Sequence, residues 1–151
     1  FFSIFFFMTI IYRMPFAFNH ELWNIGRQIE DTTLPHLNKH YDCDFKRNEN
    51  DVFDILDFKD DENKKIVEVK GRRCSSTQYK ETIITASKIT AGLQAIESDY
   101  RVFFVFVFTD KTMEYELCEN DSFKCRITGT NSILHYLIPV EDLKEIIIKE
   151  E

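Results

Sequence analysis

The chain has 151 residues and a mass of 18.0 kDa, which is the size of one domain and excludes a second independent core. Its formal charge of -7 excludes a global basic field that would attract nucleic acid, although a local basic rim can coexist with a negative total. A hydrophobic content of 44% and a charged content of 30% exclude a disordered or fibrous protein.

The stretch FFSIFFFMTIIY at the start of the chain is nearly all apolar. It is shorter than the ~20 residues that span a bilayer, and it lacks the basic start and cleavage site of a signal peptide. We therefore expect residues 1–14 to be an N-terminal extension that need not belong to the natural protein. Met8 and Met14 are candidate natural start residues. Residues 15–151 are expected to form a single domain. The alternative is that the apolar stretch adds a strand or helix to the core.

A first helix is predicted over residues 20–31, because Asn19 is a good N-cap and apolar residues recur at helical spacing. The residues expected to face inward are Leu22, Ile25 and Ile29. Pro35 is expected to end or restart this helix. A second short helical stretch should follow, marked by Leu34, Leu37 and Tyr41.

Strands are predicted next from period-two alternation of apolar residues. Residues 51–58 and 65–71 alternate well and should form a hairpin across the charged turn Lys59 to Lys64, with residues 41–47 as a weaker strand. A second amphipathic helix is predicted over residues 81–96. Residues 102–108, VFFVFVF, are apolar on both faces, which predicts a strand in the middle of a sheet covered on both sides.

The C-terminal third is predicted to hold a hairpin of residues 113–118 and 123–128, a short strand at 133–139 and a final helix at 140–149. This hairpin would place Cys118 opposite Cys125 and could permit a disulfide. The four cysteines otherwise contain no C-x2-C pair, so a zinc knuckle is disfavoured and a reducing intracellular location is expected. The predicted class is mixed α/β.

One acidic tripeptide stands out by its context. The chain contains five [DE]-x-K tripeptides, but among them Glu68-Val69-Lys70 lies in an alternating strand that follows another strand carrying acids. Val67 and Val69 form the core face of this strand, so Glu68 and Lys70 lie side by side on the opposite face. The alternative is a solvent-exposed hairpin face on which a Glu68–Lys70 ion pair contributes little to stability.

The hairpin supplies a third residue. A turn centred on Asp61 places Asp54 directly opposite Glu68, whereas a register slip would exchange Asp54 for Asp57, the reserve candidate. Two carboxylates about 5 Å apart suit Mg²⁺, which takes one or two carboxylates and keeps several waters. Lys70 would sit beside the metal, where it could orient the attacking water and offset charge on the phosphate.

The order strand-Asp, turn, strand-Glu-x-Lys, Gly-Arg, helix, hydrophobic strand resembles the PD-(D/E)xK, or restriction-endonuclease-like, superfamily over roughly residues 19–110. The resemblance implies an αβββαβ core with a mixed central sheet flanked by helices, to which the predicted C-terminal hairpin and helix are appended. It implies Mg²⁺-dependent hydrolysis of DNA, with Mn²⁺ as a substitute, Asp54 and Glu68 as metal ligands and Lys70 as the catalytic lysine. The Val69 carbonyl is a further candidate ligand. The chain departs from the motif in having Phe53 where many members have Pro.

Many members of the superfamily also carry a Glu on the first helix in a G-x-x-x-E context, which Gly26 to Glu30 is similar to. Glu30 is therefore a candidate fourth catalytic residue, with a surface carboxylate as the equal alternative. The residues that could contact nucleic acid are Arg72, Arg73, Gln78, Lys80 and Lys88, although an ordinary solvated loop and helix face would look the same.

The predicted function is that of a Mg²⁺-dependent endonuclease acting on DNA, with RNA left open. Cutting both strands commonly needs two active sites, which favours a homodimer. Two alternatives remain at this point: a catalytically inactive domain of the same fold that binds nucleic acid or protein, and an interaction module with a Phe-rich surface. The histidines show no zinc-hydrolase spacing.

Overall fold

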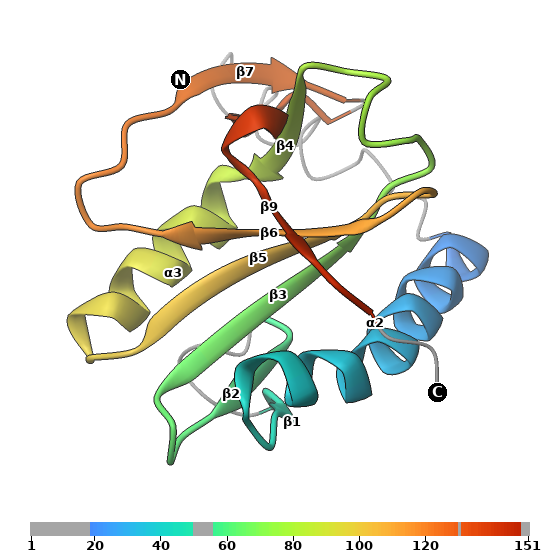
Figure 1. Ribbon diagram of the computed structural model, residues 1–151. Coiled ribbons are helices and arrows are strands. Elements are labelled where there is room, and N and C mark those ends of the chain that lie inside the picture. The colour runs from blue at the N-terminus through green and yellow to red at the C-terminus, as the bar shows by residue number, and fades with distance from the viewer. Residues whose placement is uncertain (1–18, 50–55, 130, 149–151) are drawn as a thin grey trace, which may run out of the picture.

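The computed structural model describes residues 19–49, 56–129 and 131–148 (Figure 1). The helices and strands follow one another as α2 (His20–Tyr41), β1 (Lys46–Arg47), β2 (Phe58–Asp60), β3 (Lys65–Gly71), β4 (Glu81–Thr85), α3 (Ala86–Glu97), β5 (Arg101–Val107), β6 (Thr112–Leu117), β7 (Lys124–Thr128), β8 (Ile133–Pro139), the short 3-10 helix η1 (Val140–Asp142) and β9 (Lys144–Ile146).

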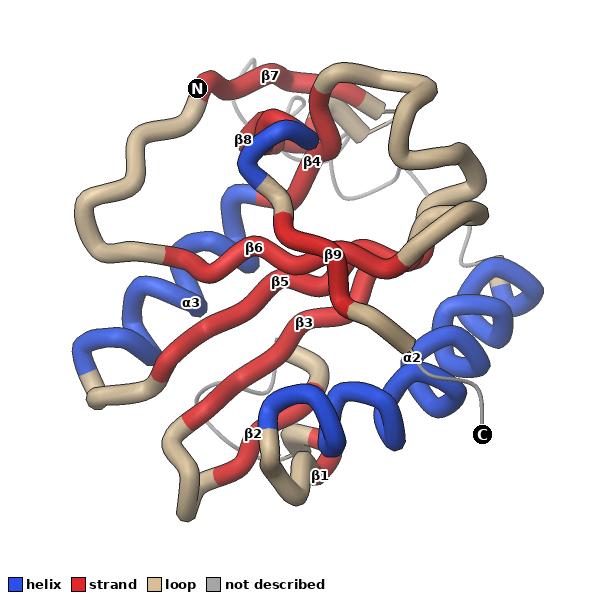
Figure 2. Tube along the Cα trace, viewed as in Figure 1, coloured by secondary structure: helices blue, strands red, loops and turns tan. Residues whose placement is uncertain are grey.

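The strands form two sheets. The six-stranded sheet has the order β1-β2-β3-β5-β6-β9, in which β3 and β5 are parallel and the other neighbours are antiparallel. The three-stranded sheet has the order β4-β8-β7 and is antiparallel (Figure 2). The crossover from β3 to the parallel β5 runs through β4 and α3. The mixed α/β class and the predicted αβββαβ order are confirmed, with β4 inserted before the second helix.

The core lies on both faces of β3 and β5. Val102 to Phe106 are all buried, which confirms the prediction of a central strand covered on both sides. Because side chains alternate along a strand, Val67 and Val69 pack with Leu37 of α2, whereas Ile66 packs with the residues of α3. The two helices therefore cover opposite faces of the larger sheet (Figure 1).

Helix α2 begins as predicted but is longer. Asn19 Oδ1 accepts hydrogen bonds from the amides of Glu21 and Leu22, at 3.1 and 3.2 Å. The helix continues past Pro35 to Tyr41, so the prediction that Pro35 ends or restarts it was wrong. Burial of Leu37 and Tyr41 against the sheet stabilises the turns that follow the proline.

The inward stripe predicted for the start of α2 is also wrong in part. Leu22 and Ile25 are 47% and 38% exposed, because the first turns of the helix extend beyond the described strands that it covers further along. Ile29 does pack against the core, as predicted.

The second helix begins at Ala86 and not at residue 81. The preceding segment Glu81–Thr85, ETIIT, is rich in β-branched residues and pairs with β8 as strand β4. Local periodicity favoured one helix, but the antiparallel partner far along the chain decides the conformation.

The C-terminal predictions were confirmed for the strands near 113–118, 123–128 and 133–139, and wrong for the pairing of the first two and for the final helix. β6 pairs with β5 and β9, while β7 pairs with β8, so the two segments are not a hairpin. Cys118 and Cys125 are free thiols. In place of a final helix, β9 adds to the edge of β6 and buries Ile146. Within the described parts of the chain, no helix has the length and apolar character needed to cross a membrane.

Candidate active site at the edge of strand β3

The register between β2 and β3 differs from the predicted one. Phe58 pairs with Val67 and Asp60 with Lys65, so the turn is centred between Glu62 and Asn63 and not on Asp61. The cause lies in Asp60, whose Oδ1 accepts hydrogen bonds of 3.0 Å from the amides of Glu62 and Asn63. Continuing this register by one residue brings Asp57, and not Asp54, opposite Glu68. Asp54 itself lies outside the described residues.

Asp57 lies where the chain leaves the ladder between β2 and β3. Phe58 packs with the α2 face of the sheet, whereas Leu56 packs with the α3 face, so the chain crosses the edge of the sheet at the bend between them. The amide of Asp57 donates a hydrogen bond of 3.0 Å to Glu68 Oε2. Its carboxylate Oδ2 accepts one of 2.7 Å from the amide of Val69. The reserve candidate is therefore the aspartate that the described structure brings against Glu68.

Glu68 is the most enclosed charge of the site. Its side chain is fully buried, yet Oε1 lies 3.0 Å from Lys70 Nζ and 3.1 Å from Lys88 Nζ. Neither ammonium group meets hydrogen-bond geometry, so Oε1 is a buried carboxylate oxygen with ion-pair neighbours and no hydrogen bond within the described structure. Lys70 lies beside Glu68 as predicted. Lys88, which is also a predicted nucleic-acid contact, reaches Glu68 from the first turn of α3.

The carboxyl group of Asp57 titrates in an unusual range. Burial, followed by the nearby carboxylates of Glu68 and Glu30, raises the pKa of Asp57 to about 8. The hydrogen bond from Val69 and the charge of Lys88 act in the opposite direction but do not compensate. The raised pKa therefore favours the protonated form of Asp57 at neutral pH.

Glu30 reaches the same place from α2. It lines a cavity of about 220 Å³ together with Asp57 and Lys88, so its predicted presence at the site agrees with the described geometry. Glu30 Oε2 also accepts a hydrogen bond of 2.7 Å from Arg47, which pairs with Asp31 as well. No sequence pattern pointed to Arg47, because its contact with Glu30 depends on β1 lying beside α2 in space.

The donor set suits a small divalent cation. Asp57 and Glu68 offer carboxylate oxygens, and the unsatisfied Oε1 of Glu68 is a buried acceptor that a cation would satisfy. Among residues 19–49, 56–129 and 131–148, no three His, Cys, Asp or Glu side chains could hold a metal by themselves. Mg²⁺ fits such a site, because it keeps several waters and takes one or two carboxylates plus substrate phosphate. The Val69 carbonyl remains a predicted ligand.

Four of the five predicted nucleic-acid contacts lie apart from this cluster. Arg73, Gln78 and Lys80 are exposed in the segment between β3 and β4. Arg72 is half-buried and lines a second, larger cavity. Of the predicted basic contacts, Lys88 is the one that the described structure places against Glu68.

The fold and the cluster of Glu30, Asp57, Glu68, Lys70 and Lys88, here called the edge cluster, define a mixed α/β domain with a buried Glu68 on its central sheet. The chain belongs to the family described as Protein NO VEIN, C-terminal, whose model matches residues 17–117. The matched range runs from before α2 to the end of β6 and contains every residue of the edge cluster. No curated protein and no solved structure gives a significant match.

Proposed function

We propose that this chain is a Mg²⁺-dependent nuclease of the restriction-endonuclease-like superfamily that hydrolyses phosphodiester bonds of DNA, with RNA as a further substrate to be tested. The observation that carries the proposal is the burial of Glu68 between Asp57 and two lysines at the point where the β2–β3 ladder ends. The αβββαβ order of the elements supports the same assignment.

Asp57 and Glu68 would hold the cation, which supplies Lewis-acid polarisation of the scissile phosphate when bound. The hydrogen bonds from Asp57 to Glu68 and from Val69 to Asp57 fix both carboxylates against the backbone, so they need little reorganisation. Asp54 remains a candidate for the same role. It lies three positions before Asp57 in the sequence and outside the described residues, so substitution must decide between the two aspartates.

The two lysines would have different tasks. The side chain of Lys70 is 32% exposed and that of Lys88 is 19% exposed, so Lys70 is the more accessible to a water molecule. We assign Lys70 to orienting the attacking water and Lys88 to stabilising negative charge on the phosphate. Both lysine ammonium groups contact Glu68 Oε1 without substrate, so their charges are already positioned at the carboxylate.

A cleavage assay tests the proposal. The full chain is incubated with supercoiled plasmid, single- and double-stranded DNA and RNA, each with Mg²⁺, Mn²⁺ or EDTA. The expected result is metal-dependent cleavage that falls at least about a hundredfold in Glu68→Gln. The matched control is Glu62→Gln, which changes an exposed residue of another Glu-x-Lys tripeptide and should leave the rate unchanged. Cleavage that survives Glu68→Gln would refute the mechanism.

A second candidate function rests on charge compensation. Glu68 has two lysine neighbours and Glu30 has Arg47, so these carboxylates have cationic partners without any metal. This arrangement favours a catalytically inactive domain of the same fold that binds nucleic acid. Binding in EDTA, combined with no cleavage of any of the substrates above, would support this candidate over the nuclease.

A further inference from the structure

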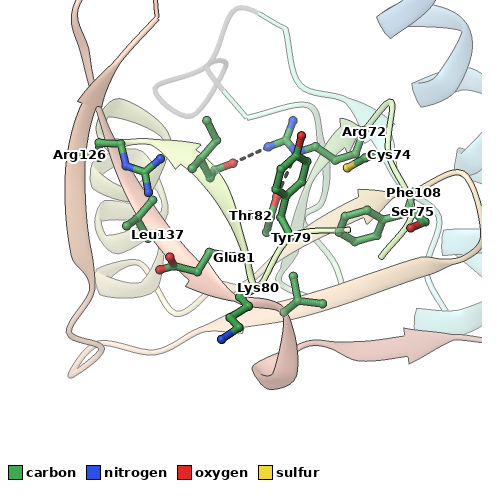
Figure 3. A pocket seen from close by; sticks show the side chains of 12 residues that line it. Arg72, Cys74, Ser75, Tyr79, Lys80, Glu81, Thr82, Phe108, Arg126 and Leu137 are labelled. Carbon is green, nitrogen blue, oxygen red and sulfur yellow. Dashed lines mark hydrogen bonds between the residues drawn. The ribbon is translucent and has the colours of Figure 1, made fainter. Parts of the chain in front are cut away.

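A cavity of about 410 Å³ lies between the segment that follows β3 and the smaller sheet (Figure 3). Its volume falls within the range of small-molecule sites. The walls combine apolar surface from Phe108, Leu137 and Val140 with cationic and hydroxyl groups from the segment after β3, from β4 and from β7. Apolar walls with a few convergent polar groups are typical of a ligand site.

Arg72 is the fixed cation of this cavity. Its Nε donates a hydrogen bond of 3.0 Å to Thr82 Oγ1, and its terminal nitrogens donate to the carbonyls of Gly71 and Ile83. Its guanidinium carbon also lies 5.4 Å from the centre of the Phe106 ring. A guanidinium has five N–H donors, so these three bonds orient the group and leave two donors.

The partners of Arg72 are all neutral. No carboxylate within the described parts of the chain forms an ion pair with it, and its burial lowers the pKa of its guanidinium. A half-buried cation without a counter-ion is costly, because its hydration is reduced and nothing of opposite charge replaces it. Such a group is stabilised by an anionic ligand, and a planar guanidinium suits phosphate oxygens in particular.

Most of the other charged residues that line the cavity are also basic. Lys80 and Arg126 also line the cavity, and both are exposed. Of the described residues that line it, Glu81 is the one that carries a carboxylate. The cavity is thus cationic in a chain whose formal charge is -7, which makes chance accumulation of basic residues a weak explanation.

Tyr79 adds an aromatic surface. Its side chain lines the cavity while the residue is 62% exposed, and Gln78 Nε2 donates a hydrogen bond of 3.3 Å to its hydroxyl. Exposed aromatic rings beside cationic groups are used to stack nucleobases, since every base has a flat π face. The apolar wall near Phe108 would enclose the other side of such a base.

We propose that this cavity binds a nucleoside monophosphate group, with the phosphate at Arg72 and Arg126 and the base stacked on Tyr79. The group would come from a free nucleotide or from the phosphorylated end of a strand, which share this chemistry. Arg72 continues the ladder to β5, because its amide donates to the carbonyl of Val107 at 2.9 Å. It therefore lies about 13 Å along β3 from Glu68 and on the same face.

This spacing relates the cavity to the proposed cleavage reaction at Glu68. A strand end held at Arg72 would run along the α3 face of the sheet toward Glu68, within a few nucleotides of the candidate active site. That consequence rests on the proposed nuclease function, whereas binding of the monophosphate does not.

Fluorescence anisotropy in EDTA tests the binding step, using the full chain and single-stranded DNA of one sequence with a 3′ fluorophore and either a 5′-phosphate or a 5′-hydroxyl. We expect the 5′-phosphate to strengthen binding at least about tenfold. Tyr79→Ala should weaken binding of the phosphorylated strand by about tenfold or more, as loss of one stacked base does. Arg126→Ala should weaken it several-fold, and both variants alter exposed residues, so folding is preserved.

The matched control for Arg126→Ala is Lys124→Ala, which removes an exposed positive charge from the same strand but outside the cavity. Equal affinities for the two 5′ ends, or equal losses in Arg126→Ala and Lys124→Ala, would overturn the proposal. Competition by dAMP, but not by adenosine, should displace the strand. A dAMP affinity equal to that of the strand would identify free nucleotides as the source, and a weaker one would identify strand ends. Because these affinities are measured in EDTA, they do not depend on metal-dependent cleavage, so failure of cleavage and failure of binding are separable.

Discussion

The amide of Asp57 donates a hydrogen bond of 3.0 Å to the buried Oε2 of Glu68, and the carboxylate of Asp57 accepts one of 2.7 Å from the next residue of β3, Val69. Asp57 thereby continues the edge contacts of β3 after the ladder with β2 has ended at Phe58. Because the contact to Glu68 comes from the backbone of Asp57, a change of its side chain to an amide should keep Glu68 in place.

The first prediction concerns the pH dependence of stability in the absence of metal. The pKa of Asp57 is raised to about 8 by burial and by Glu68 and Glu30, so the folded state holds a proton that the unfolded state releases near pH 4. This contribution is complete below the unfolded pKa and is lost as the pH rises through the folded value. The free energy of unfolding should therefore fall by up to about 1.4 kcal/mol per pH unit between pH 5 and 7.

Urea denaturation of the wild type and of Asp57→Asn, both in EDTA, checks this prediction. The variant cannot ionise at this residue, so the difference between the two proteins isolates Asp57 from the histidines that titrate in the same range. We expect the variant to gain stability relative to the wild type as the pH rises. Parallel pH profiles would show that Asp57 titrates normally.

The second prediction concerns the cation. Metal and proton compete for the carboxylate of Asp57, so the stabilisation by Mg²⁺ should be larger at pH 8 than at pH 6. Differential scanning fluorimetry at millimolar Mg²⁺ would measure the shift in the melting temperature at both pH values. Glu68→Gln should abolish most of the shift, and Ca²⁺ serves as a comparison for general ionic effects.

The third prediction separates the two lysines. Lys70→Met and Lys88→Met each leave Glu68 with one cationic neighbour, so each should cost about 1 kcal/mol of stability or less, since both lysines are partly exposed. The double variant leaves a buried carboxylate uncompensated and should cost about 3–5 kcal/mol. For cleavage, Lys70→Met should lose more activity than Lys88→Met.

A double-mutant cycle in urea measures this coupling. The control is Lys144→Met, which removes an exposed lysine from β9 and should add independently to either change. Additive effects of Lys70→Met and Lys88→Met would contradict a shared contact with Glu68.

The fourth prediction concerns the turn that sets the register. Hydrogen bonds from Asn63, Asp44 and Glu62 hold the pKa of Asp60 well below its usual range. Its contribution to stability is present above the unfolded pKa and is lost as the pH falls through the folded one. Asp60→Ala should destabilise the protein by about 1–3 kcal/mol at pH 7, with a smaller difference near pH 2, as measured by chemical denaturation. An equal cost at both pH values would show that the charge is not what matters.

The sequence predicted the central parts of the fold well. β3 and β5 carry long, strongly patterned apolar runs, and burial on both faces of β5 leaves few other arrangements. Asn19 capped the first helix because its hydrogen bonds are local, to residues two and three positions away. Such short-range interactions can be read from sequence.

Long-range pairing could not be read in this way. The segment Glu81–Thr85 is a strand because it pairs with β8, from Glu81 opposite Pro139 to Thr85 opposite His135. The predicted pairing of Asp54 with Glu68 was wrong for a local reason, because Asp60 shifts the turn by accepting a hydrogen bond from the amide of Asn63. The contact of Lys88 with Glu68 was not predicted, because it depends on how α3 is placed against the sheet.

The most direct test of the central claim is a crystal of the full chain soaked in Mn²⁺, with anomalous diffraction measured near the manganese edge. The account predicts a peak within coordination distance of Glu68 and of an aspartate, Asp57 by the described geometry, with lysine Nζ atoms displaced from Oε1. A peak bridging Glu68 and Asp54 would keep the metal site and reassign one ligand. Absence of any anomalous peak at Glu68 in millimolar Mn²⁺ would contradict the claim that this cluster is a metal-dependent active site.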